Sequence, residues 1–436
     1  MLNDIQGKLK QFTVIQCLCA CMGFIVVSVI FRMLHIPQTV MRIYWTLGLT
    51  TVLCGDLLRQ DIEPVNRIII GAAYAMRVVI VYVNEYLNNI ISSLMHIGDD
   101  NVFINASIQF YRKTPGFSYG SRQFPKLMAG MYNIFDEDPL IGTLVLVCLF
   151  MTGVCAFYKL MKESGLSLKT RIIGLAVLCF APYGIVYSVL FLREQINFCF
   201  ITLSFLFFAR HVRSHRLGEL LAAMVLSLPA IYMHWGYMPV LAGYVVYFFA
   251  IFKATQEKRT MFRLMKLVLL AIFIAGAYAM ISQSGRIKYF IQAGNFVDGL
   301  ALTFEKYMGL GGESQYLKDM RIEHTWQLFV YTPLRTLYFF LSPLPMNWRD
   351  WRDVMSFLLD STLYLGALAA YIYSLFRHRS TAVHMAFWIL AFTGATFCWA
   401  TVTAGAAIRH RTCLLALVLF IVLTVWKNRR NGEGIS

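Results

Sequence analysis

The chain has 436 residues, of which 58% are hydrophobic and only 14% are charged. Soluble proteins carry about 25% charged residues, so the composition excludes an ordinary soluble domain. The formal net charge of +16 does not indicate a nucleic-acid partner, because Lys and Arg accumulate in the cytoplasmic loops of membrane proteins. The composition therefore predicts an all-α, polytopic integral membrane protein whose surroundings are membrane lipid.

Apolar runs long enough to cross the hydrocarbon core of a bilayer recur along the chain and predict about 12 transmembrane helices. The first run follows Lys8 and Lys10 and is not followed by a convincing small-residue cleavage site, so we expect a retained helix and not a removed signal peptide. In chain order, the predicted spans are 12–33, 37–58, 68–95, 140–158, 172–189, 196–209, 220–233, 238–252, 267–281, 354–376, 385–403 and 413–426.

Basic connections set the predicted sidedness. KLMKESGLSLKTR, ARHVRSHR, KATQEKRTMFRLMK, FRHRS and KNRR are all rich in Lys and Arg, which favours a cytoplasmic location for each of them and for both termini. With both termini on the cytoplasmic side, the number of spans must be even. This requires that 326–347, which carries three prolines and Arg335, does not cross the membrane and is interfacial or re-entrant. We thus predict one transmembrane domain over 1–436 in the inner or plasma membrane, with outer loops at 96–139 and 282–347.

The 96–139 loop is the longest polar insert in the first half of the chain. It opens with Asp99 and Asp100, directly after an apolar run. A basic and aromatic run follows, and a short acidic cluster at 136–138 precedes Pro139. We expect the first acidic pair to be catalytic, although it could instead begin a helix as a cap. We interpret 136–138 as a capping loop. Candidates for substrate contact within the run are Tyr119, Arg122 and Lys126.

Other predicted spans also end on the outer side with charged or histidine side chains. Convergence of these span ends would place carboxylates, histidines and arginines around one cavity. A carboxylate can deprotonate an acceptor hydroxyl, and guanidinium groups match the geometry of a leaving phosphate. The alternatives are a charged pair at a tight turn, an interfacial His-Trp pair and headgroup anchors. The candidates are Glu194 as a catalytic carboxylate and Arg193, His234, Arg409, His410 and Arg411 as substrate-binding residues.

The order of these features resembles the GT-C superfamily of membrane glycosyltransferases, which includes protein O-mannosyltransferases and bacterial lipid A aminoarabinose transferases. The resemblance rests on the acidic pair at 99–100 with Phe103, Ala106 and Pro125, on MYNIF, on APYGIVYSVLFLREQ, on LPAIYMHWGYMPVLAGYVVYF and on AIRHRTCLLALV. Asp replaces the usual Glu at position 100, and Phe replaces the common Tyr at position 103.

This resemblance implies an inverting glycosyltransferase that acts on the outer face. The donor would be a sugar linked to polyprenyl phosphate or diphosphate, and the acceptor a glycan or a lipid, in the synthesis of cell-envelope polysaccharide or glycoconjugates. It favours Asp99 as the catalytic base with Asp100 in support. It also suggests Arg409 or Arg411 for the carrier phosphate.

Two other functions remain open from the sequence. FLREQ and YFFLSPLP also resemble segments of polysaccharide repeat-unit polymerases of the O-antigen or exopolysaccharide type. A transporter or flippase of lipid-linked sugars is the alternative from another class, although no inverted repeat is visible and the charges gather at span ends.

No cofactor is indicated by a motif. The ten cysteines lie in or beside apolar segments and form no CxxC pair, so neither a zinc site nor a redox motif is predicted. Some GT-C members bind a divalent cation through acidic residues, but no metal-ligand spacing occurs here, and the metal requirement stays open.

The sidedness can be tested at Ser118, inside the 96–139 loop. In a background whose native cysteines are replaced, Ser118→Cys should react with a membrane-impermeant maleimide added outside intact cells. Labelling that occurs only after the cytoplasmic side is opened would invert the predicted topology.

Overall fold

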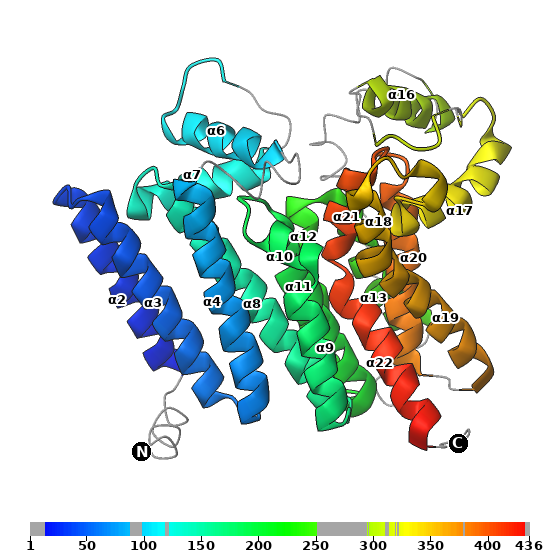
Figure 1. Cartoon of the computed structure of the whole chain (residues 1–436), viewed down its shortest axis with the longest axis horizontal. Coiled ribbons are helices and arrows are strands. Elements are labelled where there is room, and N and C mark those ends of the chain that lie inside the picture. The colour runs from blue at the N-terminus through cyan, green and yellow to red at the C-terminus, as the bar shows by residue number, and fades with distance from the viewer. Residues whose placement is uncertain are drawn as a thin grey trace, which may run out of the picture. The chain divides into compact units, whose positions relative to one another are not determined.

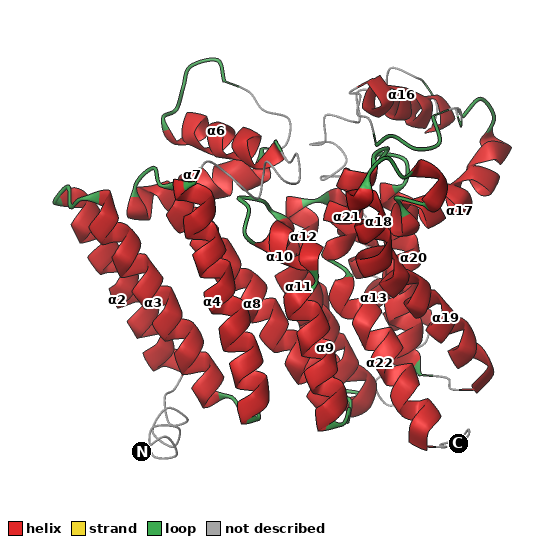
Figure 2. Cartoon of the chain, viewed as in Figure 1, coloured by secondary structure: helices red, strands yellow, loops and turns green. Residues whose placement is uncertain are grey.

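The structure is a computed structural model that describes residues 14–87, 98–117, 122–250, 294, 296–309, 314–318, 320, 322–377 and 380–431. Figure 2 shows helices joined by loops, without a strand among the described residues. A single pair of residues, Gln315 and Thr403, forms an isolated β-bridge in this part of the chain. The all-α prediction is thus confirmed for the described residues.

The predicted spans within the described residues coincide with helices, although the one at 172–189 is broken in two. The span predicted at 267–281 and the end of 68–95 lie outside the described residues. By length and composition, four helices can cross a membrane, or up to six if each bent pair is one span. This is a helical protein with membrane-spanning character. The four are Pro64–Tyr86, Pro139–Glu163, Glu194–Ser214 and Trp351–Arg377.

The chain divides into two compact units, and it crosses between them within α8, in the connection before α9 and within α11. Figure 1 labels the helices of both units. Unit 1 comprises 1–158 and 167–199, and unit 2 comprises 159–166 and 200–436. The helices of unit 1 are α2 (Val14–Met33), α3 (Gln38–Arg59), α4 (Pro64–Tyr86), α6 (Asp99–Tyr111), α7 (Gln123–Phe135), most of α8 (Pro139–Glu163), α9 (Leu168–Phe180), α10 (Pro182–Ser188) and the start of α11 (Glu194–Ser214).

Unit 2 contains the rest of α11 and the helices of the second half of the chain. These are α12 (Leu217–Met233), η1 (Trp235–Tyr237), α13 (Met238–Ala250), α16 (Phe296–Gly309), α17 (Thr325–Leu341), η3 (Pro345–Asn347), α18 (Trp351–Ser356), η4 (Phe357–Ser361), α19 (Thr362–Arg377), α20 (Thr381–Phe397), α21 (Ala404–Thr412) and α22 (Leu415–Asn431).

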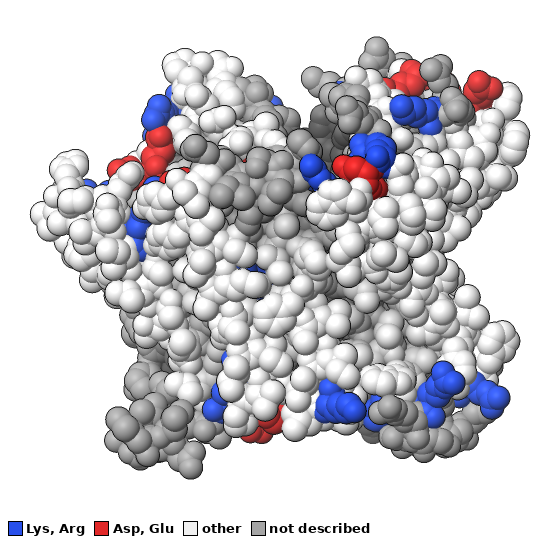
Figure 3. Space-filling view, viewed as in Figure 1, with Lys and Arg blue, Asp and Glu red and all other residues white. Residues whose placement is uncertain are grey.

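Ion pairs at helix ends show that the long helices of unit 1 alternate in direction. Arg42, in the first turn of α3, contacts Asp138, directly before α8, at 2.7 Å and Glu85, near the end of α4, at 3.0 Å. At the opposite ends of α3 and α4, Glu63 contacts Arg171 of α9 at 2.5 Å. On the face drawn in Figure 3, charged side chains gather at helix ends and the middle of the helices is largely uncharged.

The outer face of α2 and α3 exposes apolar side chains, including Met22, Val26, Ile43 and Leu47. Contiguous apolar surface of this kind is unusual on a soluble monomer and is suited to contact with lipid. In contrast, α8 is buried within the protein over most of its length.

The break between α9 and α10 is centred on Pro182, where the helix axis bends by 54°. Proline lacks the N–H that would continue the helical ladder, so nearby carbonyls need other donors. Arg77 of α4 supplies them, because it is fully buried and donates to the Cys179 carbonyl at 2.9 Å and to Ser188 Oγ at 2.7 Å. Its guanidinium also lies over the ring of Phe150, 4.8 Å from the centroid.

Residues 326–347, predicted to be interfacial or re-entrant, contain most of α17, which has Pro333 inside it. This helix packs mainly against α20 and α21 within unit 2. Arg335 of α17 is fully buried, lies over the rings of Phe304 and Trp399, and donates to the carbonyls of Leu317 and Met320. Among the helices searched, α17 is not one of the candidate spans.

Replacing Glu63 tests the ion pair that closes one end of unit 1. Burial would raise the pKa of the Glu63 carboxyl, but hydrogen bonds from Tyr158 and Asn66 and the charge of Arg171 outweigh it and lower that pKa to about 2. A lowered pKa means that the stabilisation is complete above the unfolded value of 4.5 and is lost as the pH falls towards 2.

Glu63→Gln should therefore lower the free energy of unfolding at pH 7 by about 1–3 kcal/mol, since the carboxyl is only partly exposed. Thermal unfolding in detergent measures this, and the difference from the wild type should shrink between pH 4.5 and 2. Glu305→Gln, at an exposed position of α16, is the control. Equal unfolding temperatures for both variants at pH 7 would contradict the role of Glu63.

Candidate functional site

The first acidic pair lies at the start of α6. Both carboxylates are in the first helical turn, where they interact favourably with the helix dipole, and Gly98 takes the capping position. Asp99 is exposed, whereas Asp100 is only 3% exposed and shares the buried face of α6 with Phe103 and Ser107. The two carboxylates therefore occupy different environments.

The connection between α10 and α11 approaches this face of α6. Arg193 and Glu194 are both buried. The guanidinium of Arg193 lies over the ring of Phe103, 5.6 Å from the centroid, and Phe103 is one helical turn after Asp100. Unit 1 thus places Asp100 and Arg193 on either side of Phe103. Their catalytic roles stay predictions.

Aromatic rings hold α6, α7 and this connection together. The ring of Phe103 contacts that of Phe124 edge to face at 5.2 Å, and Phe124 contacts Phe191 at 5.4 Å. A Cβ on Gly142 would lie 2.7 Å from the Phe191 ring, so α8 also approaches closely here. The rings form a hydrophobic support behind the charged side chains.

The basic candidates of the 96–139 loop have a more peripheral position. Arg122 directly precedes α7 and is exposed, and Lys126 is exposed with its ammonium 5.6 Å from the centroid of the Phe110 ring. Tyr119 lies outside the described residues. The substrate contacts of Arg122 and Lys126 stay predictions.

The acidic cluster at 136–138 is a capping and ion-pairing loop, as the sequence predicted. Asp138 accepts from the Leu140 N–H at 3.0 Å at the start of α8 and pairs with Arg42. Glu137 pairs with Arg112 at 2.6 Å at the surface. These carboxylates therefore hold the ends of the 96–139 insert against the helices.

In unit 2, the structure brings His234 and His410 together. Their ring centroids are 4.7 Å apart, and both rings contact Phe397. The Nδ1 atom of His234 accepts from the Gly236 N–H at 3.1 Å, which places the ring proton of the neutral imidazole on Nε2. A Cβ on Gly236 would lie 2.3 Å from Phe397, so the close packing at this point requires glycine.

Arg411 has a different environment from the one expected of a phosphate ligand. It is fully buried, and its guanidinium contacts Asp360 at 2.5 Å and Ser361 Oγ at 3.1 Å. It also donates to the carbonyls of Phe339 and Phe340 at 3.0 and 2.7 Å. These protein acceptors occupy each of its three nitrogens, so the geometry favours a bracing role. Phosphate contact is better suited to Arg409, which is half-buried.

Asp360 was not among the sequence candidates. The sequence does indicate its importance, because Asp360 is a lone carboxylate in the apolar run predicted at 354–376. Ionisable groups inside spans usually pair within the protein. Only tertiary structure shows that its partner is Arg411, 51 residues later.

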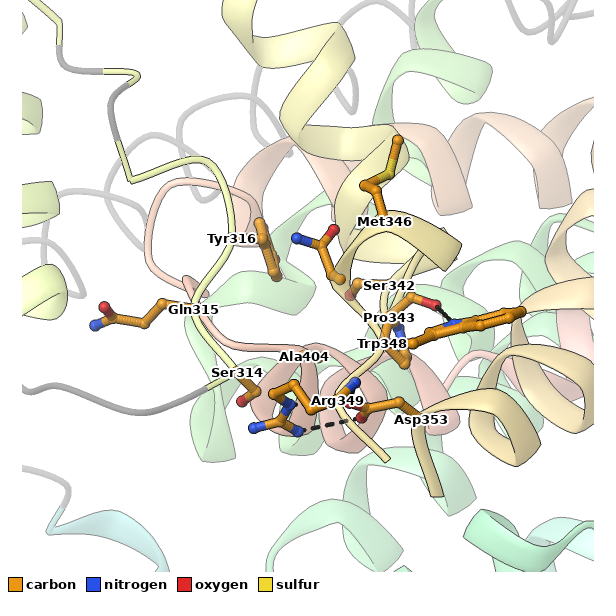
Figure 4. Close-up of a pocket in the computed structure, with 11 residues that line it drawn as sticks. Ser314, Gln315, Tyr316, Ser342, Pro343, Met346, Trp348, Arg349, Asp353 and Ala404 are labelled. Atoms are coloured by element: carbon orange, nitrogen blue, oxygen red, sulfur yellow. Dashed lines mark hydrogen bonds and ion pairs between the residues drawn. The ribbon is translucent and has the colours of Figure 1, made fainter. Parts of the chain in front are cut away.

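A cavity of about 250 Å³ lies in unit 2 (Figure 4). Its walls come from the 314–316 segment, from the turn that follows α17, and from the first residues of α18 and α21. The polar and aromatic side chains that line it include Tyr316, Ser342, Asn347, Trp348, Arg349 and Asp353.

The 314–316 segment is attached to the start of α21 by backbone hydrogen bonds. Tyr316 N donates to the Val402 carbonyl at 3.0 Å, and Ala404 N donates to the Ser314 carbonyl at 3.0 Å. The buried Tyr316 hydroxyl donates to the Thr401 carbonyl at 2.7 Å, and burial raises the pKa of this phenol well above its usual range. Tyr316 is therefore a neutral hydrogen-bond donor that fixes one wall.

In the part of the chain that the structure describes, no group of three or more His, Cys, Asp or Glu side chains could hold a metal ion. No protein-family model, curated protein or solved structure matches this chain. The fold and these clusters define a helical membrane protein with buried charged groups at its helix ends.

Arg411 and Arg409 should respond differently to substitution. Arg411→Met leaves Asp360 buried without its partner, and such a change costs about 3–5 kcal/mol of stability. The matched Arg409→Met should change the unfolding temperature far less. Adding Asp360→Leu to Arg411→Met should recover part of the loss, because a buried pair can be exchanged for apolar side chains. Thermal unfolding in detergent measures all three, and a wild-type unfolding temperature for Arg411→Met would refute the bracing role.

Proposed function

We propose that this protein is a membrane glycosyltransferase that takes a sugar from a polyprenyl-phosphate- or diphosphate-linked donor on the outer face of the cell membrane. The observation that carries the proposal is the buried group in unit 1, where Asp100 and Arg193 both lie beside Phe103 and Glu194 directly follows Arg193. Burying carboxylates and a guanidinium at helix ends is costly, and such groups usually serve function.

The chemistry is a single displacement at the anomeric carbon. A carboxylate accepts the proton of the acceptor hydroxyl as that oxygen bonds to the anomeric carbon, and the bond from this carbon to the phosphate oxygen breaks. The carrier leaves as a phosphate or diphosphate anion, and Arg193 is suited to stabilise the charge that develops. Attack opposite the leaving group inverts the anomeric centre.

Burial changes which carboxylate we propose as the base. The resemblance to GT-C enzymes favours Asp99, but this side chain is exposed, whereas Asp100 faces the interior next to Phe103. A base works in a position that excludes bulk water and holds its orientation. We therefore propose Asp100 as the base, Asp99 as its neighbour at the helix start, and Glu194 as the second buried carboxylate.

The proposal includes about 12 spans with both termini in the cytoplasm. The alternation of helix ends in unit 1 supports it, because Arg42 at the start of α3 pairs with Glu85 near the end of α4 and with Asp138 before α8, and these two helices flank the 96–139 insert. The buried Arg335 and the internal proline of α17 support an arrangement in which 326–347 does not cross the membrane.

Repeat-unit polymerisation uses the same displacement with a diphosphate leaving group and a second lipid-linked glycan as acceptor. The length of the product distinguishes this form from transfer of a single sugar. A lipid-linked sugar transporter would move the donor across the bilayer without releasing the carrier.

The decisive assay uses purified protein in lipid nanodiscs with undecaprenyl diphosphate-linked saccharides extracted from the membranes of the expressing cells. Mass spectrometry measures the released undecaprenyl diphosphate and the lengthened saccharide. Asp100→Asn should reduce the release about 100-fold or more, the usual contribution of a general base. Glu194→Gln should also reduce it.

Glu137→Gln, which changes a carboxylate of the same insert that pairs with Arg112, is the control and should keep wild-type turnover. Loss of activity in Asp99→Asn with activity retained in Asp100→Asn would move the base to Asp99. Carrier release that is unchanged in both variants would overturn the catalytic proposal.

A further inference from the structure

We propose that the cavity beside α17, α18 and α21 in unit 2 is a binding site for one neutral sugar ring. It lies outside the group of carboxylates in unit 1 to which transfer is assigned. The proposal extends the proposed function by placing a saccharide on a second set of residues, but it concerns binding alone and does not require turnover.

Two polar atoms in the cavity lining lack a hydrogen-bond partner within the described residues. They are the Oγ atom of Ser342, a side chain that is only 1% exposed, and the buried Oδ1 atom of Asn347. Buried polar atoms in folded proteins are almost always satisfied by protein, water or ligand. Both residues line the cavity, and a hydroxyl group and an amide are suited to the hydroxyl groups of a sugar.

Trp348 provides an aromatic surface at the same place. Its indole is 37% exposed, and its Nε1 donates to the Pro343 carbonyl at 3.1 Å, as Figure 4 shows. Phe357 contacts the indole with ring centroids 5.8 Å apart. These contacts fix the orientation of the ring before any ligand arrives. A rigid aromatic side chain adds apolar contact area at little cost in conformational entropy.

The charges in the lining cancel. Arg349 contacts Asp353 through two nitrogens, with Nε 2.9 Å and Nη2 3.1 Å from the carboxylate oxygens (Figure 4). Because its cation is already neutralised, this pair does not favour a phosphate or a carboxylate over a neutral ligand. It still offers donors and acceptors close together, which neutral polyhydroxyl ligands can use.

The volume of the cavity limits the ligand. Pockets for drug-sized molecules measure about 300–1,000 Å³, so a cavity of about 250 Å³ admits one small polar group. It is too small for a polyprenyl chain. Polar lining and small size together favour a single sugar ring over a lipid.

The hydrogen bonds of Arg411 stabilise the segments that form the cavity walls. Arg411 donates to the carbonyls of Phe339 and Phe340, which directly precede the turn that contains Ser342. The Ser361 hydroxyl, itself bound to Arg411, donates to the Ser342 carbonyl at 3.4 Å. Ala404, which lines the cavity, begins α21, and Arg411 is in the last turn of the same helix.

Saturation-transfer difference NMR tests the binding with purified full-length protein in lipid nanodiscs. Detergents with sugar headgroups are avoided because they would compete. The probes are glucose, galactose, N-acetylglucosamine, glucuronate and inorganic phosphate. We expect at least one of the three neutral sugars to receive saturation, and to bind more tightly than glucuronate or phosphate.

Asn347→Leu and Trp348→Ala should each weaken that binding about tenfold. The first removes one hydrogen bond to the sugar, and the second removes the aromatic surface that the ring contacts. Trp351→Ala is the matched control, because Trp351 is a highly exposed indole on α18 that does not line the cavity, and it should bind as the wild type does. Ser342→Ala provides a third test if either variant has a lowered unfolding temperature.

Absence of saturation transfer to all three neutral sugars would overturn the proposal and indicate a water-filled cavity. Tighter binding of glucuronate or phosphate, or binding that survives both Asn347→Leu and Trp348→Ala, would also overturn it. Asp100→Asn separates this site from the transfer reaction, because it should retain wild-type sugar binding. Sugar binding that persists while wild-type protein shows no transfer would refute only the proposed function.

Discussion

The buried ion pair between Arg411 and Asp360 determines much of the arrangement of unit 2. Neither charge is stable in an apolar interior without its partner, so the two must meet. Their contact brings α21 to the π-helical turn before α19, and the remaining donors of Arg411 reach the last turn of α17. Tyr364 adds a hydrogen bond to the Arg411 carbonyl at 2.7 Å. The cavity and the His410 ring are both positioned by helices that this pair joins.

Unit 1 follows the same constraint with different residues. Polar backbone groups inside an apolar bundle must find partners within the protein. Arg77 therefore donates to a carbonyl freed near the break at Pro182, and this keeps the interrupted helix pair next to α4. At the end of the unit that carries the polar insert, Arg42 and Asp138 place α6 and α7 next to the ends of the long helices.

Burial separates side chains that have the same chemical nature and adjacent positions. Asp99 and Asp100 are identical in the sequence, but only Asp100 shares a face of α6 with Phe103 and hence lies near Arg193. Arg409 and Arg411 are similarly close in sequence, but Arg411 is fully buried with its nitrogens bound to protein acceptors, whereas Arg409 is half-buried. A general base needs an enclosed, oriented position and a phosphate ligand must reach the guanidinium, so these differences change which member of each pair is the better candidate.

The sequence alone determined the all-α class, the apolar runs that form the long helices and the polar insert with its acidic pair, because hydropathy and charge are local properties of the chain. It also named His234 and His410 as candidates at the ends of predicted spans, but not their contact. The sequence could not identify the partner of Arg411 or choose the buried member of the acidic pair. It also could not show that Ser342 and Asn347 line one cavity. These depend on helix rotation and on contacts between distant segments, which only the tertiary structure decided, because a side chain's environment is set by the elements that pack against it.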